Sequence, residues 1–224
     1  IITSFTRDPV TPVKNEDGTY TKSTYSDVWN PVAIIDYDNP LSTTYRAIAN
    51  VYANITFLKK FTFKTSYSTE YANNEYSNYT PVYYVFAAQQ NPTVNSLTNS
   101  TYSTCVQQFT NTLTYEKKFG AHDFSAMIGG ESYSVKYKSL QATVKDIPSD
   151  DPNVIFINNA KTKDTNAAAR GVTTDAKQLS VLARLNYVYM DKYLLTANFR
   201  ADGSSKFVRG KRWGTFPSLS LGWR

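Results

Sequence analysis

The sequence has very few of the residues that cross-link small proteins or hold metals. Cys105 is the only cysteine and His122 the only histidine among 224 residues. One cysteine cannot form an internal disulfide or a cysteine zinc site, and one histidine cannot form a multi-histidine metal cluster. We therefore expect Cys105 to be a small apolar strand residue and His122 an interfacial polar residue, with no metal site and no cofactor.

Long hydrophobic runs are also missing, and the mean hydropathy is −0.44. A membrane-spanning helix needs roughly 20 consecutive apolar residues, so we expect no helical span. A transmembrane β-strand needs only about 9–11 residues, of which every second one is apolar, so low hydropathy is compatible with a membrane barrel. No signal peptide is recognisable at Ile1, and residues 219–224 read as an interrupted strand. We expect both ends to lie inside a longer protein.

Motifs of enzymes and of nucleic-acid-binding proteins are absent as well. The sequence contains no G-x-S-x-G, P-loop or G-x-G-x-x-G, so we expect no catalytic residues and no enzyme activity. The net charge is +6, but the cations are scattered rather than gathered in a basic helix, which argues against a nucleic-acid partner.

Two charged loops leave alternatives open. Asp146, Asp150 and Asp151 could offer oxygen ligands to Ca²⁺, but their spacing fits no EF-hand loop and favours a solvated acidic loop. A basic loop could meet lipopolysaccharide phosphates or a partner, or could simply be soluble; it carries Lys206, Arg209, Lys211 and Arg212.

The residues that are abundant favour an all-β protein. Aromatic residues make up 15% of the chain, and tyrosine alone occurs 18 times. Tyr and Thr suit strands, whereas Asn, Ser and Gly suit turns. Apolar and polar side chains alternate with the period of two that places them on opposite faces of a strand. The alternating segments, about seven in all, are 45–57, 61–71, 104–117, 124–133, 179–189, 193–202 and 219–223.

The connections between these segments are very unequal in length. Short turns near Lys59, Gly120 and Asp191 join strands into hairpins. The remaining segments are interpreted as loops: 1–42, 73–102, 139–177 and 203–212. Short turns at one end and long loops at the other are typical of outer-membrane barrels, with the short turns periplasmic. Aromatic residues beside the short turns predict an interfacial girdle: Phe57, Phe61, Tyr115, Phe119, Phe124, Tyr189 and Tyr193.

The alternation also assigns the two faces of each strand. We expect one face to meet lipid, through Tyr45, Val51, Ile55, Phe61, Phe63, Phe109, Leu113, Leu185, Leu195 and Leu221. We expect the other to face the lumen, through Arg46, Asn50, Lys64, Glu131, Arg184 and Arg200. A soluble β-sandwich also alternates, but its strands average about 5–6 residues and carry turns at both ends. About seven strands leave two open edges, which lipid does not tolerate, so we expect further strands from outside this sequence.

Several stretches resemble one family. Residues 182–197, 200–207 (Arg-Ala-Asp-Gly-Ser-Ser-Lys-Phe) and 212–223 (Arg-Trp-Gly-Thr-Phe-Pro-Ser-Leu-Ser-Leu-Gly-Trp) closely resemble a signature region of SusC/RagA-like TonB-dependent transporters. Shorter stretches resemble a loop and two short-turn hairpins of that family: 15–20, 30–33, 57–65 and 113–120. The resemblance covers most of the chain in the expected order.

The resemblance implies an outer-membrane protein of a Gram-negative bacterium that crosses the membrane many times, in contact with outer-membrane lipid. It implies a barrel of about 22 strands closed by a plug. Residues 1–224 would then be part of the barrel domain, since neither the plug nor the segment that contacts TonB is matched here. It further implies import driven by the TonB complex, a SusD-like lipoprotein partner, and an oligosaccharide or peptide substrate. The alternative function is a surface structural or adhesive β-protein without transport.

Aromatic residues in the 73–102 segment are the candidate contacts for substrate or partner. They are Tyr76, Tyr79, Tyr83, Tyr84 and Phe86. Exposed aromatic rings offer large flat contact areas with little side-chain entropy to lose. The alternative is that this segment folds on itself and hides the rings.

Overall fold

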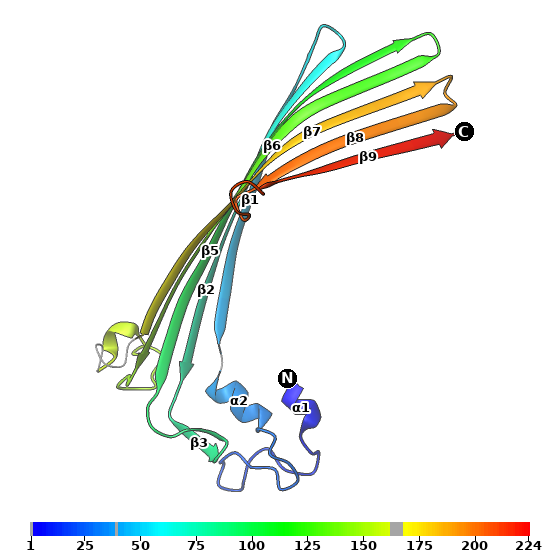
Figure 1. The fold of residues 1–224 in the computed structure, drawn as a ribbon. Helices are drawn as coiled ribbons and strands as arrows, with labels where there is room; N and C mark the ends of the chain where they lie inside the picture. The colour runs from blue at the N-terminus through cyan, green and yellow to red at the C-terminus, as the bar shows by residue number, and fades with distance from the viewer. Residues whose placement is uncertain (1, 39, 162–167) are drawn as a thin grey trace. The chain divides into compact units, whose positions relative to one another are not determined.

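The computed structural model describes residues 2–38, 40–161 and 168–224. Seven strands form one sheet in the order β1-β2-β5-β6-β7-β8-β9, so neighbours in the sheet follow one another along the chain (Figure 1). The strands are β1 (Leu41–Phe57), β2 (Phe61–Thr80), β5 (Ser96–Phe119), β6 (His122–Lys145), β7 (Ala168–Tyr189), β8 (Tyr193–Ser204) and β9 (Trp213–Trp223). The expected all-β antiparallel sheet of seven strands is confirmed. Among the described residues the sheet is open, with β1 and β9 as its edges.

The smaller elements lie in the connections. A second, two-stranded antiparallel sheet pairs β3 (Tyr83–Phe86) with β4 (Gln89–Asn91). The helices are α1 (Ile2–Thr6), α2 (Pro31–Tyr37) and the 3₁₀-helix η1 (Ile157–Asn159). No helix of the described residues has both the length and the apolar character needed to cross a membrane.

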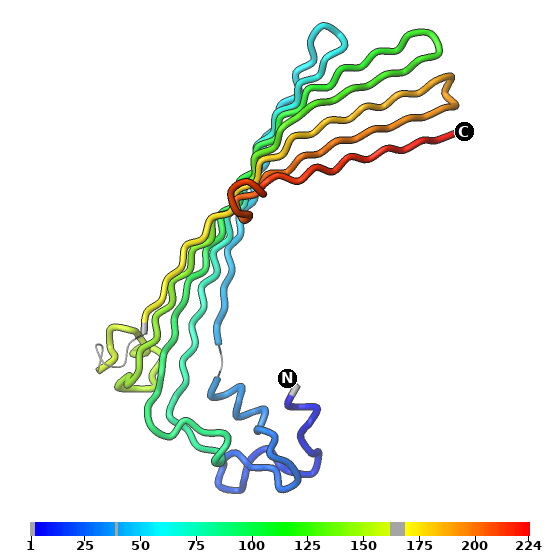
Figure 2. The backbone as a smooth tube through the Cα atoms, viewed as in Figure 1, coloured from blue at the N-terminus to red at the C-terminus, as the bar shows by residue number. Residues whose placement is uncertain are grey.

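The three predicted short turns are confirmed at residues 58–60, 120–121 and 190–192 (Figure 2). In the first, Leu58 and Lys59 have φ of 50° and 55°. Met190 and Asp191 have φ of 53° and 51° in the third. Two consecutive residues with positive φ make a type I′ turn, whose twist matches that of the paired strands. The tight turns therefore fix the register of these hairpins.

The predicted loops were too long. Strand β2 continues to Thr80 and β5 begins at Ser96, so much of 73–102 is strand; likewise β6 continues to Lys145 and β7 begins at Ala168, inside 139–177. Hydrophobic alternation fades in these extensions because both faces carry Thr, Ser, Asn and Tyr. Backbone pairing and polar cross-strand contacts hold them instead, such as Ser77 Oγ donating to Asn99 Oδ1 at 2.8 Å. Residues 1–42 also include two short helices and the first residues of β1.

The chain divides into two compact units. The loop-side unit comprises residues 1–45, 73–102 and 139–172, and the turn-side unit comprises 46–72, 103–138 and 173–224. The loop-side unit has a small core of Leu97, Val144, Ile147 and Ala160, against which Tyr79, Ile155 and Ile157 pack. The turn-side unit contains the alternating parts of the strands and all three short turns.

Candidate lumen-facing network and membrane-facing surface

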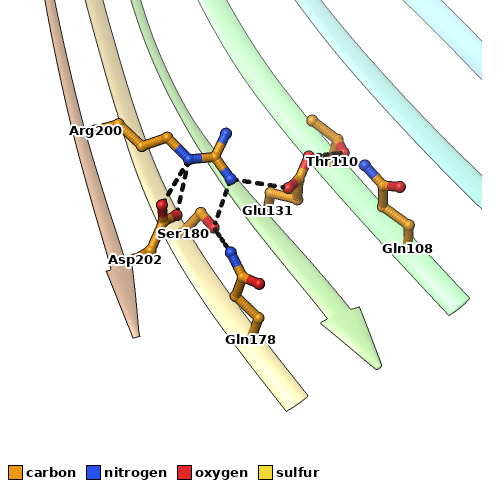
Figure 3. Close-up of polar contacts among 7 residues, drawn as sticks. All are labelled: Gln108, Thr110, Glu131, Gln178, Ser180, Arg200 and Asp202. Carbon is orange, nitrogen blue, oxygen red and sulfur yellow. Dashed lines mark hydrogen bonds and ion pairs between the residues drawn. The ribbon is translucent and has the colours of Figure 1, made fainter. Parts of the chain in front are cut away.

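A polar network runs sideways across four strands of the turn-side unit (Figure 3). Its centre is Glu131 on β6, whose Oε2 accepts hydrogen bonds from Gln108 Nε2 at 2.8 Å and Thr110 Oγ1 at 3.3 Å, both on β5. On the opposite side, Glu131 Oε1 lies 3.4 Å from Arg200 Nη2 on β8. One carboxylate thus links three strands.

Arg200 extends the network to β7 and along β8. Its Nε donates to both carboxylate oxygens of Asp202, at 2.8 and 2.9 Å. Its Nη2 donates to Ser180 Oγ on β7 at 3.2 Å, and only 1% of Ser180 is exposed. Gln178 Nε2 contacts the same Ser180 oxygen at 3.5 Å. Hydrogen bonds to charged groups are roughly twice as strong as neutral ones, so the network ties β5 to β8 more firmly than backbone pairing alone.

The other predicted lumen-facing residues lie on the same face. Lys64 lines a trough of about 690 Å³ together with Thr110, a member of the network. Arg46 Nε donates to Glu70 Oε1 at 2.8 Å across β1 and β2, and Arg184 Nε donates to Asn198 Oδ1 at 2.7 Å across β7 and β8. Asn50 shares the parity of Arg46 on β1. The structure thus gathers all six candidates on one face of the turn-side unit, while their exposure to a lumen stays a prediction.

The opposite face of the turn-side unit is apolar. One shallow hollow is lined by Phe63, Leu113, Ile128 and Val181, which come from four neighbouring strands. Leu195 and Leu221 are direct cross-strand partners. Val51 is 71% exposed and Leu221 76% exposed. A contiguous apolar surface of this kind is unfavourable in water and marks a membrane or protein contact.

The trough on the polar face is rich in hydroxyl groups. Besides Lys64, its lining includes Thr56, Thr62, Thr112 and Thr114. Hydroxyls and one ammonium group can hydrogen-bond water, a polar ligand or another part of a protein, but they supply neither a nucleophile paired with a base nor a metal site. No cluster of three metal-ligating side chains occurs within residues 2–38, 40–161 and 168–224.

In the loop-side unit, Asn30 and Gln89 hold the 1–38 segment to the β3–β4 hairpin. Asn30 N donates to Gln89 Oε1 at 2.7 Å, and Gln89 Nε2 donates back to Asn30 O at 3.0 Å. Both side chains are buried. Asn30 also caps α2, since its Oδ1 accepts from Val32 N and Ala33 N at 3.1 and 3.3 Å. The Asn30-Pro31 pair is a sequence signal for a helix start, which the loop interpretation missed.

A second amide holds the β6–β7 connection in place. Asn95 Nδ2 donates to Ile147 O at 2.8 Å, and Asn95 Oδ1 accepts from Ile147 N at 2.7 Å. The Asn95 side chain thus satisfies both backbone groups of Ile147, as a paired strand would. The Asp146, Asp150 and Asp151 loop is held by protein contacts: the Tyr79 hydroxyl donates to Asp150, and Lys161 Nζ lies 3.8 Å from Asp146.

Hydrogen bonds to two carboxylates of the 1–38 segment change the pKa of a side chain. The hydroxyl of Ser23, followed by contacts from Thr11, lowers the pKa of Asp8 to about 2. The hydrogen bond from the Tyr20 hydroxyl to Asp36 raises the pKa of Tyr20 to about 12. Burial raises the pKa of Tyr83.

The five candidate aromatic residues differ in exposure. Tyr84 is 67% exposed, whereas Phe86 is only 7% exposed. Tyr83 stacks on Tyr37 with ring centroids 4.4 Å apart, Tyr79 is held by Asp150, and Tyr76 lines a pocket of about 370 Å³ with Leu41, Leu140 and Ile157. Phe86 is therefore buried and Tyr84 is the most exposed of the five, while a contact role for these rings stays a prediction.

Five members of the polar network were missed by sequence reasoning as site residues: Gln108, Thr110, Gln178, Ser180 and Asp202. Their parity on each strand was the available signal, since Gln108 and Thr110 stand on the polar side of their segment. Which of the polar residues would meet across strands depends on register, and hydrophobic alternation fixes register only to the nearest two residues.

The fold and its two faces define a class of protein: an antiparallel meander with one apolar face and one cross-linked polar face, as in the wall of a membrane barrel.

No protein-family model matches the sequence. Parts of individual curated proteins do match. The chain is 30% identical over 215 residues to TonB-dependent receptor P3 of Formosa agariphila, covering 94% of this chain and 21% of the relative. It is 30% identical over 220 residues to TonB-dependent receptor SusC of Bacteroides thetaiotaomicron, covering 96% of this chain and 20% of the relative.

Solved structures match the fold. The RagAB peptide transporter aligns with a TM-score of 0.79 and 21% identity over 91% of this chain and 23% of that chain. The chain thus spans about a fifth of the length of the curated relatives it matches. In sequence the chain is therefore similar to part of the TonB-dependent receptors P3 and SusC, and in fold it is similar to part of RagAB, which marks it as SusC/RagA-like.

Proposed function

We propose that this chain forms part of the barrel wall of an outer-membrane nutrient importer of a Gram-negative bacterium. The observation that carries the proposal is the Gln108–Glu131–Arg200 network on one face, opposite the exposed apolar face. A charged network of this kind is costly against lipid but stable against water or a plug. The matched relatives named TonB-dependent receptors support the same interpretation.

The rest of the importer is proposed by analogy with those relatives. The barrel would be completed by strands beyond these residues and closed by a plug. The TonB complex would drive import from the periplasm, and a SusD-like lipoprotein would cover the loop side. The substrate would be an oligosaccharide or a peptide; RagAB is named as a peptide transporter, and the names of the receptors P3 and SusC give no substrate.

The loop-side unit is the proposed contact region for substrate and partner. Tyr84, on the β3–β4 hairpin that Gln89 ties to the 1–38 segment, is the most exposed of the five candidate aromatic side chains. A ring on a fixed hairpin loses little freedom when it binds, which favours a contact role.

Growth of cells tests this function. A strain lacking the gene is complemented with the full-length wild-type gene or with Tyr84→Ala, and grown on single polysaccharides or on casein oligopeptides as the sole nutrient source. We expect loss of growth on one nutrient class, rescue by the wild type, no rescue in a strain lacking TonB, and weaker rescue by Tyr84→Ala. Tyr25→Ala is the matched control, because Tyr25 is 73% exposed and outside the candidate set. Unchanged growth on every source, with loss of surface adhesion, would instead support the structural or adhesive alternative.

A further inference from the structure

Lysine residues lie in or just before every short turn. Lys59 and Lys60 form the β1–β2 turn, Lys117 and Lys118 precede the β5–β6 turn, and Lys192 ends the β7–β8 turn. All five are exposed. We call these five residues the lysine rim.

Backbone hydrogen bonds join the turns to their neighbours in a row. Glu116 N donates to Lys60 O at 2.9 Å, Met190 N donates to Ala121 O at 2.8 Å, and Arg224 N donates to Lys192 O at 3.0 Å. Each bond links a turn to the next strand end or turn of the turn-side unit. The lysines therefore stand along one edge of this unit rather than on unrelated surfaces.

An aromatic belt follows the same edge. Phe57, Phe61 and Tyr115 form one run of rings, with centroids 5.5 and 4.9 Å apart. Phe119, His122 and Tyr189 form another, with centroids 5.0 and 4.9 Å apart. Aromatic rings in such a position sit at the level of lipid headgroups.

Two rim lysines lie over rings of this belt. Lys117 Nζ is 5.3 Å from the centroid of Phe119. The belt continues from Tyr189 to Tyr193, with centroids 6.4 Å apart, and Tyr193 pairs with Trp223 on β9. Lys192 Nζ is 5.7 Å from the centroid of Tyr193 and 5.6 Å from that of Trp223, which is 75% exposed. Cation–π contact holds the ammonium group beside the ring while leaving its other protons free to donate.

The rim has more positive than negative charge. Five lysines and Arg224 stand with three carboxylates, those of Glu116, Asp123 and Asp191. In the part of the chain that the structure describes, none of these carboxylates forms an ion pair with a rim lysine, since the ion pairs found involve other residues. The lysines thus keep their charge available to an external anion.

We propose that the lysine rim binds the phosphate of anionic phospholipid headgroups, with the aromatic belt packed against the glycerol and upper acyl region. This inference rests on the proposed function only in placing the short turns at a membrane interface. Lysines near a membrane surface attract anionic lipid, and the ring beside the ammonium group suits a ligand that is charged at one end and apolar at the other.

Lipid binding to the full-length receptor in detergent tests the proposal. Native mass spectrometry counts adducts of dioleoyl-phosphatidylglycerol, with dioleoyl-phosphatidylethanolamine and inorganic phosphate as separate probes. The rim variant is Lys59→Gln/Lys60→Gln/Lys117→Gln/Lys192→Gln. The matched control removes four cations elsewhere in the turn-side unit, by Lys206→Gln/Arg209→Gln/Lys211→Gln/Arg212→Gln. A second rim variant with four Lys→Arg substitutions keeps the charge.

We expect the number of phosphatidylglycerol adducts to fall at least about threefold in the rim variant. The Lys→Arg variant and the matched control in the 206–212 loop (the loop variant) should keep their adducts. Phosphatidylethanolamine and inorganic phosphate should show no such difference. Equal phosphatidylglycerol binding by the rim variant and the wild type, or equal losses in the rim and loop variants, would overturn the proposal. Competition by inorganic phosphate alone would show a simple anion site and would overturn it too. The experiment does not measure nutrient uptake, so its result does not depend on whether the proposed transport function is correct. The heat-dependent gel shift of each variant verifies barrel assembly.

Discussion

Arg200 on β8 and Glu131 on β6 form an ion pair, with Nη2 3.4 Å from Oε1, that crosses the intervening strand β7. Interstrand backbone pairing reaches only nearest neighbours, so this contact adds a connection between second neighbours. Arg200 also bonds to Ser180 on β7, and Glu131 also bonds to Gln108 on β5.

Replacement of Glu131 tests this network. Glu131→Leu removes the acceptor of Gln108, Thr110 and Arg200, and we expect it to lower the free energy of unfolding by about 1–3 kcal/mol. Glu131→Gln keeps one acceptor oxygen and should cost less. The urea midpoint of the refolded full-length barrel measures both. Wild-type stability in the Leu variant would show that the network contributes nothing.

Leu185 and Asn186 are adjacent on β7 but lie on opposite faces, as their partners Ala197 and Thr196 show. If Leu185 lies near the bilayer midplane, Leu185→Arg should cost about 2–4 kcal/mol. Asn186→Arg places the same side chain on the polar face and should cost far less. Equal losses in lipid vesicles would contradict the assignment of the faces.

Gln89 and Gln90 provide a matched pair for the loop-side unit. Gln89→Ala removes both hydrogen bonds to the backbone of Asn30, which leaves buried groups unsatisfied at a cost of about 1–3 kcal/mol. Gln90→Ala removes only an exposed bond to Ala87 O. Hydrogen exchange in peptides from residues 10–36 should accelerate about tenfold or more in the first variant alone. Unchanged exchange would show that another contact holds this segment.

The lowered pKa of Asp8 predicts how the 1–38 segment responds to acid. Its pKa, lowered to about 2 by Ser23 and Thr11, lies below the ordinary value of 3.8. A group whose pKa falls on folding stabilises the fold above its unfolded pKa and loses that effect as pH drops through the folded pKa. Protease resistance of this segment should therefore be complete above pH ~4 and decline towards pH ~2. Asp8→Asn should remove this part of the acid dependence; an unaltered acid profile in that variant would exclude Asp8 as its source.

The alternating parts of the chain were predictable from the sequence, and the polar extensions were not. Residues such as Leu179, Val181 and Ala183 alternate because one face avoids water and the other does not, so the period of two is visible. Beyond that region, as at Tyr76–Thr80, both faces are polar and the period disappears although the strand continues. The six lumen-facing candidates were predicted from polarity and strand parity, and their exposure to a lumen stays a prediction. Ser180 and Asn30, in contrast, owe their contacts to Arg200 and Gln89, which are far away in sequence.

Segment 195–198 of β8 offers the most direct test of the central claim, that one face of this sheet meets lipid and the other does not. In a Cys105→Ser background of the full-length receptor, single spin labels are placed at Leu195, Thr196, Ala197 and Asn198, and the receptor is reconstituted in lipid vesicles. Collision with oxygen reports lipid, and collision with a water-soluble nickel chelate reports water. Our account predicts high oxygen accessibility at Leu195 and Ala197 and low values at Thr196 and Asn198. Equal oxygen accessibility at all four positions, or higher values at Thr196 and Asn198 than at Leu195 and Ala197, would contradict it.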